Sequence, residues 1–249
     1  MVVWGDRRNG LDRVITAARV TPQWTVLDTG QVVCSNSTYQ IAPAIAFDGA
    51  RFLVVWQNLA NPYGIYCRFL GGDGLPQDSV ITISSSVTAA NPRIVAGGSQ
   101  FFVVWQEYEA TNNIVGRFVS PVGNLVGDTI MITSGTANHV SPGVCYDGDH
   151  FLVVWSQNTI YGQFISNAGN LIGAALPIST STNEQVDPDV FLGNDKYLVI
   201  WSEFGTDYDI YGNLDTQVGI STHRDDIPSA PDIYPDRTIF VDRVRLIGG

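Results

Sequence analysis

The sequence predicts an all-β fold, a five-bladed β-propeller of four-stranded antiparallel blades. One observation is a Val-Val-Trp or Val-Ile-Trp motif that recurs at a spacing of 46 to 52 residues, at Val2–Trp4, Val54–Trp56, Val103–Trp105, Val153–Trp155 and Val199–Trp201. A second is a proline that keeps the same period, at Pro43, Pro92, Pro142, Pro188 and Pro231. A third is the absence of helical periodicity between these markers. A period of about 50 residues without helices is typical of propeller blades.

Each repeat contains four apolar or β-branched runs. The first two run from the proline to the tryptophan and are joined by a tight turn, for which Asp48-Gly49 and Asp147-Gly148 are strong hairpin signals because glycine tolerates a positive φ. A third run follows the tryptophan, at Gly64–Phe69, Asn113–Phe118, Thr159–Phe164 and Asp209–Leu214. A fourth run follows at Val80–Ser84, Ile130–Ser134 and Leu176–Thr180. The pattern therefore predicts four strands per repeat.

The prolines divide the single domain, residues 1–249, into blades. They predict blade 2 at 43–91, blade 3 at 92–141, blade 4 at 142–187 and blade 5 at 188–230. The first repeat begins inside its second strand, and the sequence PDIYPDR at 231–237 resembles the missing first strand. We expect blade 1 to combine 231–249 with 1–42, which would close the ring and remove two exposed strand edges. The alternative to a closed ring is that this chain is a piece of a longer repeat array.

Charge and hydropathy narrow the class of partner. The chain has 249 residues, 45% of them hydrophobic, and a net charge of −11 from 13 Lys and Arg against 24 Asp and Glu. Nucleic acid is not an expected partner because phosphates require clustered cations. No membrane insertion is expected, since no apolar run approaches about 18 residues. A signal peptide is not recognisable at the N-terminus, so secretion would depend on a leader outside this chain.

The cysteines and histidines do not predict a metal site. Cys34, Cys67 and Cys145 fall on strands of different repeats, without the Cys-x-x-Cys spacing of a zinc site. We expect three buried free thiols. The three histidines likewise lack the mutual spacing of metal ligands.

Function is expected at one end of each blade. The loops just after each tryptophan and just before each proline lie at the same end, because the first two strands are antiparallel; we call this the post-Trp end. The opposite end, which carries the Asp-Gly type turns, is the DG-turn end. The DG turns are short and uniform, whereas the post-Trp loops vary in length and composition. Variable loops on a rigid scaffold commonly carry binding.

The second position after the tryptophan is always an acid or an amide, at Asp6, Asn58, Glu107, Gln157 and Glu203. One interpretation is that these side chains accept backbone N–H bonds and tighten the turn. The other is that, with Asp189 and Asp232, they form an acidic mouth that binds sugar hydroxyls or a calcium ion through oxygen ligands. Aromatic faces for sugar rings would come from Tyr39, Tyr63, Tyr108, Phe204 and Tyr208.

Two segments carry a resemblance to known repeats. The sequences DGARFLVVWQN at Asp48–Asn58 and DYDIYGNL at Asp207–Leu214 resemble the DG-x-x-(F/Y)-LVVW…DIYG repeats of large secreted or surface-attached bacterial and archaeal β-propeller proteins. WGDRRNGLD at Trp4–Asp12 matches the loop of that repeat most fully. The resemblance implies an extracellular or cell-surface propeller.

The main hypothesis is a non-catalytic module that binds a glycan or a protein. Its predicted ligand-binding residues are Asp6, Asn58, Tyr63, Glu107, Tyr108, Gln157, Asp189, Glu203, Tyr208 and Asp232. The alternative is a glycoside hydrolase, because five-bladed propellers include arabinanase- and fructosidase-type enzymes that use carboxylates in a central funnel. In that case Asp6, Glu107 and Glu203 would be catalytic. The nearly equal repeat lengths argue against it. No organic cofactor is expected, and calcium is the candidate ion.

Overall fold

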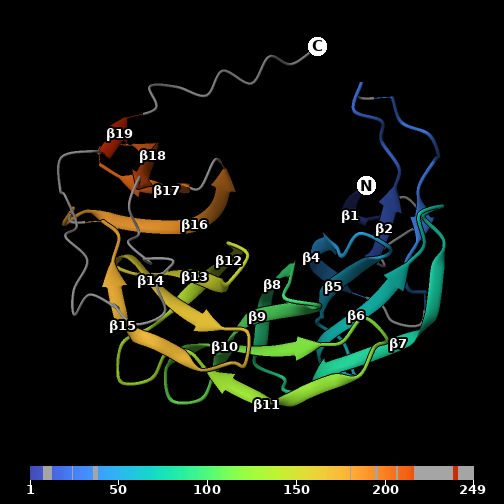
Figure 1. The fold of residues 1–249 in the computed structure, drawn as a ribbon, viewed down its shortest axis with the longest axis horizontal. Helices are drawn as coiled ribbons and strands as arrows, with labels where there is room; N and C mark the ends of the chain where they lie inside the picture. The colour runs from blue at the N-terminus through green and yellow to red at the C-terminus, as the bar shows by residue number, and fades with distance from the viewer. Residues whose placement is uncertain are drawn as a thin grey trace. The chain divides into compact units, whose positions relative to one another are not determined.

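The computed structural model describes residues 1–7, 13–23, 25–35, 39–179, 181–193, 196–205, 207–215 and 238–240. The protein is all-β, with five antiparallel sheets (Figure 1). The first has three strands and the other four have four strands each. Two compact units carry them: Met1–Thr136 holds the first three sheets and Ala137–Gly249 the last two. Across the described part of the chain, no helix is long and apolar enough to span a membrane.

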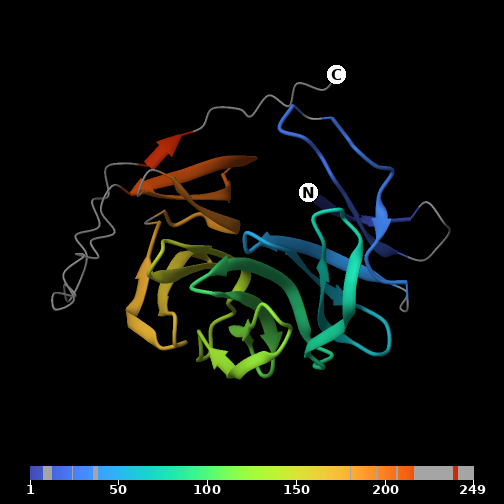
Figure 2. The ribbon, with the colours of Figure 1, turned by 45° about the vertical axis from the view of Figure 1, so that its right-hand side comes forward.

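Strands that follow one another in the chain are neighbours in each sheet (Figure 2). The first sheet consists of β1 (Val2–Asp6), β2 (Val14–Ala18) and β3 (Gln31–Val32). The second consists of β4 (Gln40–Phe47), β5 (Phe52–Asn58), β6 (Gly64–Leu70) and β7 (Pro76–Ser84). The third consists of β8 (Ala89–Gly97), β9 (Gln100–Tyr108), β10 (Asn112–Val119) and β11 (Leu125–Met131).

The second unit repeats this order. The fourth sheet consists of β12 (Val140–Tyr146), β13 (His150–Gln157), β14 (Thr159–Ser166) and β15 (Leu171–Pro177). The last consists of β16 (Glu184–Gly193), β17 (Lys196–Phe204), β18 (Tyr208–Asp215) and β19 (Thr238–Phe240). Four strands per repeat are confirmed for these four-stranded sheets. The fourth strands β7, β11 and β15 begin four or five residues earlier than the apolar runs predicted.

The repeated proline and the repeated tryptophan belong to one β-bulge. In each four-stranded sheet, the proline of the first strand and the residue before it lie together opposite the tryptophan of the second strand. The residue before the proline has a positive φ in every case: Ala42 (48°), Asn91 (53°), Ser141 (54°) and Asp187 (52°). Proline has no N–H for the strand ladder, and a bulge gives it a position where none is needed. The two markers therefore keep step because they form one feature.

The repeated tryptophans pack against residues of the third strand in the sheet interiors. Trp56 stacks on Tyr66 and Trp155 on Tyr161 across neighbouring strands, with 6.3 Å between ring centroids in both pairs. In the third sheet, the residue opposite Trp105 is followed by Gly116, and a Cβ on Gly116 would lie 2.6 Å from the Phe102 ring. The second-strand tryptophans of the four-stranded sheets are at most 2% exposed. These motifs thus serve the fold.

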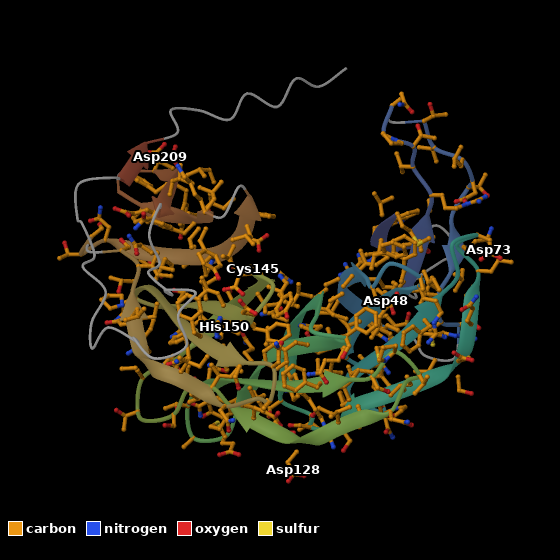
Figure 3. All side chains as sticks on the ribbon, in the orientation of Figure 1. Asp48, Asp73, Asp128, Cys145, His150 and Asp209 are labelled. Carbon is orange, nitrogen blue, oxygen red and sulfur yellow. The ribbon has the colours of Figure 1, made fainter. Side chains whose placement is uncertain are left out.

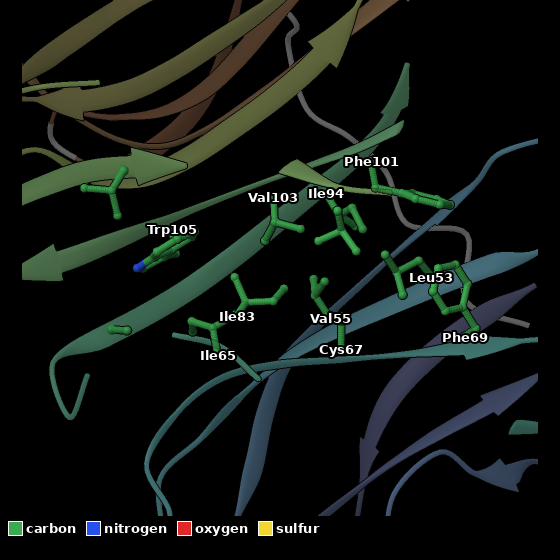
Figure 4. Close-up of a cluster of buried hydrophobic side chains, with 13 residues drawn as sticks. Leu53, Val55, Ile65, Cys67, Phe69, Ile83, Ile94, Phe101, Val103 and Trp105 are labelled. Atoms are coloured by element: carbon green, nitrogen blue, oxygen red, sulfur yellow. The ribbon is translucent and has the colours of Figure 1, made fainter. Parts of the chain in front are cut away.

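Apolar clusters join consecutive sheets within each unit. Leu53, Val55 and Phe69 of the second sheet pack with Phe101 and Trp105 of the third (Figure 4). A second cluster joins the fourth and last sheets through Leu152, Val154, Ile160, Phe164, Val190, Val199 and Trp201. Burying apolar surface stabilises by about 25 cal/mol per Å². The Val-Val-Trp strand β5 is therefore buried on both faces, because the second sheet packs against the first and against the third.

The described C-terminal residues correct one prediction. We expected 231–249 to help complete blade 1, but β19 pairs with β18 as the fourth strand of the last sheet. Ile239 lies opposite Gly212, the same register that places Ile130 opposite Gly116 in the third sheet. Strand β1 pairs only with β2 within the described ranges. Residues 238–240 therefore continue the last repeat, and a closed ring stays a prediction.

All three cysteines are buried free thiols, as predicted. Burial raises the pKa of the Cys145 thiol to about 12, and it raises the pKa of Cys67 as well. A thiol must ionise to act as a nucleophile or metal ligand. Cys67 and Cys145 are therefore packing residues.

Candidate functional site

Glu203, two residues after Trp201, is a buried carboxylate that accepts four hydrogen bonds. The donors are Ser181 Oγ at 2.6 Å, Gln185 Nε2 at 2.6 Å, Asn183 Nδ2 at 2.9 Å and Trp201 Nε1 at 3.3 Å. Burial alone would raise the pKa of Glu203, but these hydrogen bonds outweigh it and hold the pKa below its usual value. The general acid of a glycosidase needs a raised pKa. Glu203 is therefore unsuited to that role.

The same position in the third and fourth sheets shows what the residue does. Glu107 Oε2 accepts a hydrogen bond from Trp105 Nε1 at 2.8 Å. Gln157 occupies the position in the fourth sheet, and there the buried Trp155 Nε1 has no hydrogen-bond partner among the described residues. Glu107 and Glu203 therefore accept hydrogen bonds within the fold, as the first interpretation expected. The donor from their own strand is the tryptophan indole N–H and not a backbone N–H.

In the second sheet the equivalent residue fixes a loop. Asn58 is buried, and its Nδ2 donates to the Pro62 carbonyl at 2.8 Å. The Tyr66 hydroxyl lies 3.3 Å from the same carbonyl and 3.2 Å from that of Tyr63. These contacts order the loop between β5 and β6. Tyr63 is consequently held on a fixed backbone with its own side chain exposed.

All five aromatic residues predicted at the post-Trp ends are exposed, each with 42 to 55% of its surface accessible to solvent. They are Tyr39, Tyr63, Tyr108, Phe204 and Tyr208. Tyr39 lies beside the ordered loop of the second sheet, because its carbonyl accepts the Leu59 N–H at 3.0 Å. Phe204 and Tyr208 contact each other, with 5.0 Å between ring centroids and 55° between planes. Aromatic rings on an ordered backbone offer apolar contact area with little entropy to lose on binding.

The remaining predicted acids are Asp6, Asp189 and Asp232. Asp6 is the half-buried last residue of β1. Asp189 is half-buried on β16, where its Oδ1 accepts the Val190 N–H at 2.9 Å, and the bulge separates it from the residue paired with Glu203. Asp232 lies outside the described residues. Among the residues that the structure describes, no group of three or more His, Cys, Asp or Glu side chains is placed to hold a metal ion.

Sequence reasoning missed one residue that the strand register brings to the aromatic pair of the last sheet. Glu184 on β16 lies opposite Phe204 on β17, which in turn lies opposite Tyr208 on β18. In Figure 3 the labelled Asp209, next to Tyr208, marks this post-Trp end, and Asp48 marks the DG-turn end of the second sheet. The pairing of Glu184 with Phe204 depends on the bulge at Pro188, and a single sequence does not show how a bulge shifts the register. The sequence also does not show that β16 begins four residues before this proline.

Comparison with known proteins identifies the fold. No family model and no curated protein matches the chain. It is similar to a thermostable family-43 glycoside hydrolase, with a TM-score of 0.54, 13% identity, and coverage of 72% of this chain and 69% of that one. It is also similar to the Bacteroides ovatus protein described as xyloglucan PUL GH43B, with a TM-score of 0.53, 13% identity, and coverage of 71% and 39%.

A third similar structure is a GH43 endo-arabinanase from Bacillus licheniformis, with a TM-score of 0.52, 14% identity, and coverage of 71% of this chain and 72% of that one. The fold is that of the propeller glycoside hydrolases. For several of these structures, including the Bacteroides ovatus protein, the chain spans about two fifths of their length. At such identities the likeness concerns the fold alone.

Proposed function

We propose that this chain is a carbohydrate-binding propeller module that uses the exposed aromatic residues at the post-Trp ends of its sheets. The observation that carries the proposal is the placement of Tyr39, Tyr63, Tyr108, Phe204 and Tyr208, all exposed and all at that end. Sugar rings present apolar C–H faces that stack on aromatic rings. The likeness to glycoside hydrolases favours a glycan over a protein as the ligand.

Binding accounts for the acids better than catalysis does. A glycosidase needs two carboxylates on either side of the scissile bond, one of them with a raised pKa. Of the predicted catalytic set, Glu107 and Glu203 accept hydrogen bonds from tryptophans of their own strands, and Glu203 has a lowered pKa.

Glycoside hydrolysis is the second candidate, and the fold favours it. The similar structures are described as family-43 glycoside hydrolases, including an arabinanase. If this chain hydrolyses a glycan, its carboxylates are Asp6 and Asp189 in preference to Glu107 and Glu203. Asp189 lies on a first strand, just beyond the bulge of β16.

A glycan array, run beside chromogenic arabinosides, fructosides and galactosides, tests both candidates. The proposal expects glycan binding without turnover. Replacing Tyr63, Tyr108 and Tyr208 together by alanine should weaken binding by about two- to tenfold for each ring that stacks on the glycan, since a stacked ring contributes about 0.5–1.5 kcal/mol. Phe47→Ala is the matched control, because Phe47 is 50% exposed at the DG-turn end of the second sheet.

Two results would overturn the proposal. Glycan binding that survives the triple alanine replacement would move the site away from the post-Trp ends. Turnover that is lost in Asp6→Asn or Asp189→Asn, in a variant that unfolds at the same urea concentration as the wild type, would establish the glycosidase instead.

A further inference from the structure

The post-Trp end of the last sheet carries a row of three exposed side chains that differs from the other aromatic sites. Glu184, Phe204 and Tyr208 occupy directly paired positions on β16, β17 and β18. Paired residues of antiparallel strands project from the same face of the sheet. All three are exposed, and the two rings are in contact. The row therefore presents a carboxylate beside a pair of aromatic rings.

The turn that supports this row adds a second exposed carboxylate. Asp207 precedes Tyr208, and its Oδ1 accepts the Tyr208 N–H at 2.9 Å. Its carbonyl accepts the Gly205 N–H at 3.0 Å, which closes the turn between β17 and β18. Asp207 therefore lies in the turn next to Tyr208, and Glu184 lies opposite Phe204.

No described basic side chain of the segment Ala137–Asp215 lies near these acids. Lys196 is the only Lys or Arg in that segment. It begins β17, which ends at Phe204, so it lies about 26 Å along the strand at about 3.3 Å per residue. The Debye length at physiological salt is about 8 Å. Lys196 therefore does not screen the charge of Glu184 and Asp207.

The aromatic site of the second sheet lacks this charge. Its loop, Asn58–Tyr63, reads NLANPY and contains no ionisable group except the tyrosine phenol. Its exposed apolar side chains are Tyr39, Leu59 and Tyr63. Such a surface suits the uncharged faces of neutral sugars.

We infer that the row of Glu184, Phe204 and Tyr208, which we call the amine site, binds glycans that carry protonated amino groups, such as glucosamine oligomers. The inference rests on the proposed carbohydrate-binding function. An ammonium group is attracted to aromatic faces and to carboxylates at once, so one substituent satisfies both features of the row. The sugar ring that bears it stacks on the same aromatic pair.

Two oligomers that differ in whether the amine is free or acetylated test the inference on the whole chain. The glucosamine hexamer and the N-acetylglucosamine hexamer are titrated by calorimetry in mildly acidic buffer of low ionic strength, where the amines are protonated. We expect the glucosamine hexamer to bind about tenfold more tightly, because it gains ion-pair and cation–π contacts. The preference should shrink when salt is raised to about 1 M, where the Debye length is about 3 Å.

The variants separate the charge from the rings. Glu184→Gln should reduce the preference several-fold. Asp128→Asn removes the same charge from the exposed strand β11 and is the matched control, for which the preference should persist. Phe204→Ala should weaken binding of the glucosamine hexamer more than Tyr63→Ala does.

Each contrary outcome has a separate meaning. Equal affinity for the two hexamers, or a preference that Glu184→Gln leaves intact, overturns the amine site while glycan binding stands. Tighter binding of an oligolysine peptide than of the glucosamine hexamer, lost in Glu184→Gln, overturns it in favour of a basic protein partner. Absence of binding to any glycan overturns the proposed function itself.

Discussion

The fourth and last sheets use the same repeat position in different ways. Two residues after its tryptophan, the last sheet has Glu203, which accepts the indole N–H and three further donors. The fourth sheet has Gln157, and the indole N–H of Trp155 is left without a partner in the described structure. The tryptophan is buried in both. A repeated polar residue beside a buried indole is therefore first a matter of satisfying a buried donor.

The difference extends to the contact between the two sheets. Gln185, which donates to Glu203, also accepts the Ile160 N–H at 3.1 Å and donates to Ser179 Oγ at 2.6 Å. Ile160 belongs to β14, so this network links the last sheet to the fourth through fully buried polar groups. Networks of this kind stabilise only when every member has a partner. Glu203 is the acceptor that completes it.

The largest expected effect is therefore from Glu203→Ala. The substitution removes the acceptor of four donors, of which Gln185 and Trp201 are buried. Leaving buried donors without partners costs about 1–3 kcal/mol each, so we expect a loss of about 2–6 kcal/mol in the free energy of unfolding. Urea unfolding followed by tryptophan fluorescence measures it. A loss below about 1 kcal/mol would show that the network is dispensable.

Acid should weaken the last sheet through the same residue. Because hydrogen bonds hold the pKa of Glu203 below its unfolded value of about 4.3, its contribution is complete above that pH and is lost as the pH falls through the folded pKa. The stability difference between the wild type and Glu203→Gln should thus be largest at neutral pH and shrink in acid. Urea unfolding across this range measures it, with Asp128→Asn as the control for net charge. A difference that is constant with pH would contradict the assignment.

Glu107→Ala should cost less than Glu203→Ala. Glu107 is half-buried and accepts the Trp105 indole N–H, but no polar network like that of Glu203 surrounds it in the described structure. We expect a loss of about 1–2 kcal/mol in the free energy of unfolding, the cost of one buried donor without a partner. Running both variants through the same urea titration makes the comparison direct. Equal losses would mean that the additional donors of Glu203 contribute nothing.

The sequence predicted the features that repeat and missed those that depend on neighbouring sheets. The Asp48-Gly49 turn forms as its residues require, with Gly49 at a φ of 98° and the Asp48 carboxylate accepting the N–H groups of Ala50 and Arg51. The beginning of β15 was missed because this strand is largely exposed, so its apolar residues do not alternate regularly. Thr238–Phe240 was assigned to the wrong sheet because pairing with β18 is a long-range contact.

The candidate site follows the same division. The polar character of the second position after the tryptophan was readable, and so were the exposed aromatics. The partners of Glu203 were not, since Ser181 and Asn183 precede β16 and Gln185 lies on it, and all three meet Glu203 only in the folded sheet. The sequence alone therefore does not distinguish an acidic residue that binds a ligand from one that accepts hydrogen bonds in a buried network.

The smallest expected effect is a gain, and it makes the fourth sheet resemble the last. Gln157→Glu places a carboxylate at the position from which Glu107 and Glu203 accept an indole N–H. Because the Trp155 indole N–H has no partner within the described structure, the new acceptor should add about 0.5–1.5 kcal/mol to the free energy of unfolding. For a protein of this size that raises the melting temperature by about 1–6 °C. Gln157→Leu, which offers no acceptor, is the matched control and should show no gain. If Gln157→Glu is no more stable than Gln157→Leu, the indole-to-carboxylate hydrogen bonds of the third and last sheets depend on more than the acidic residue.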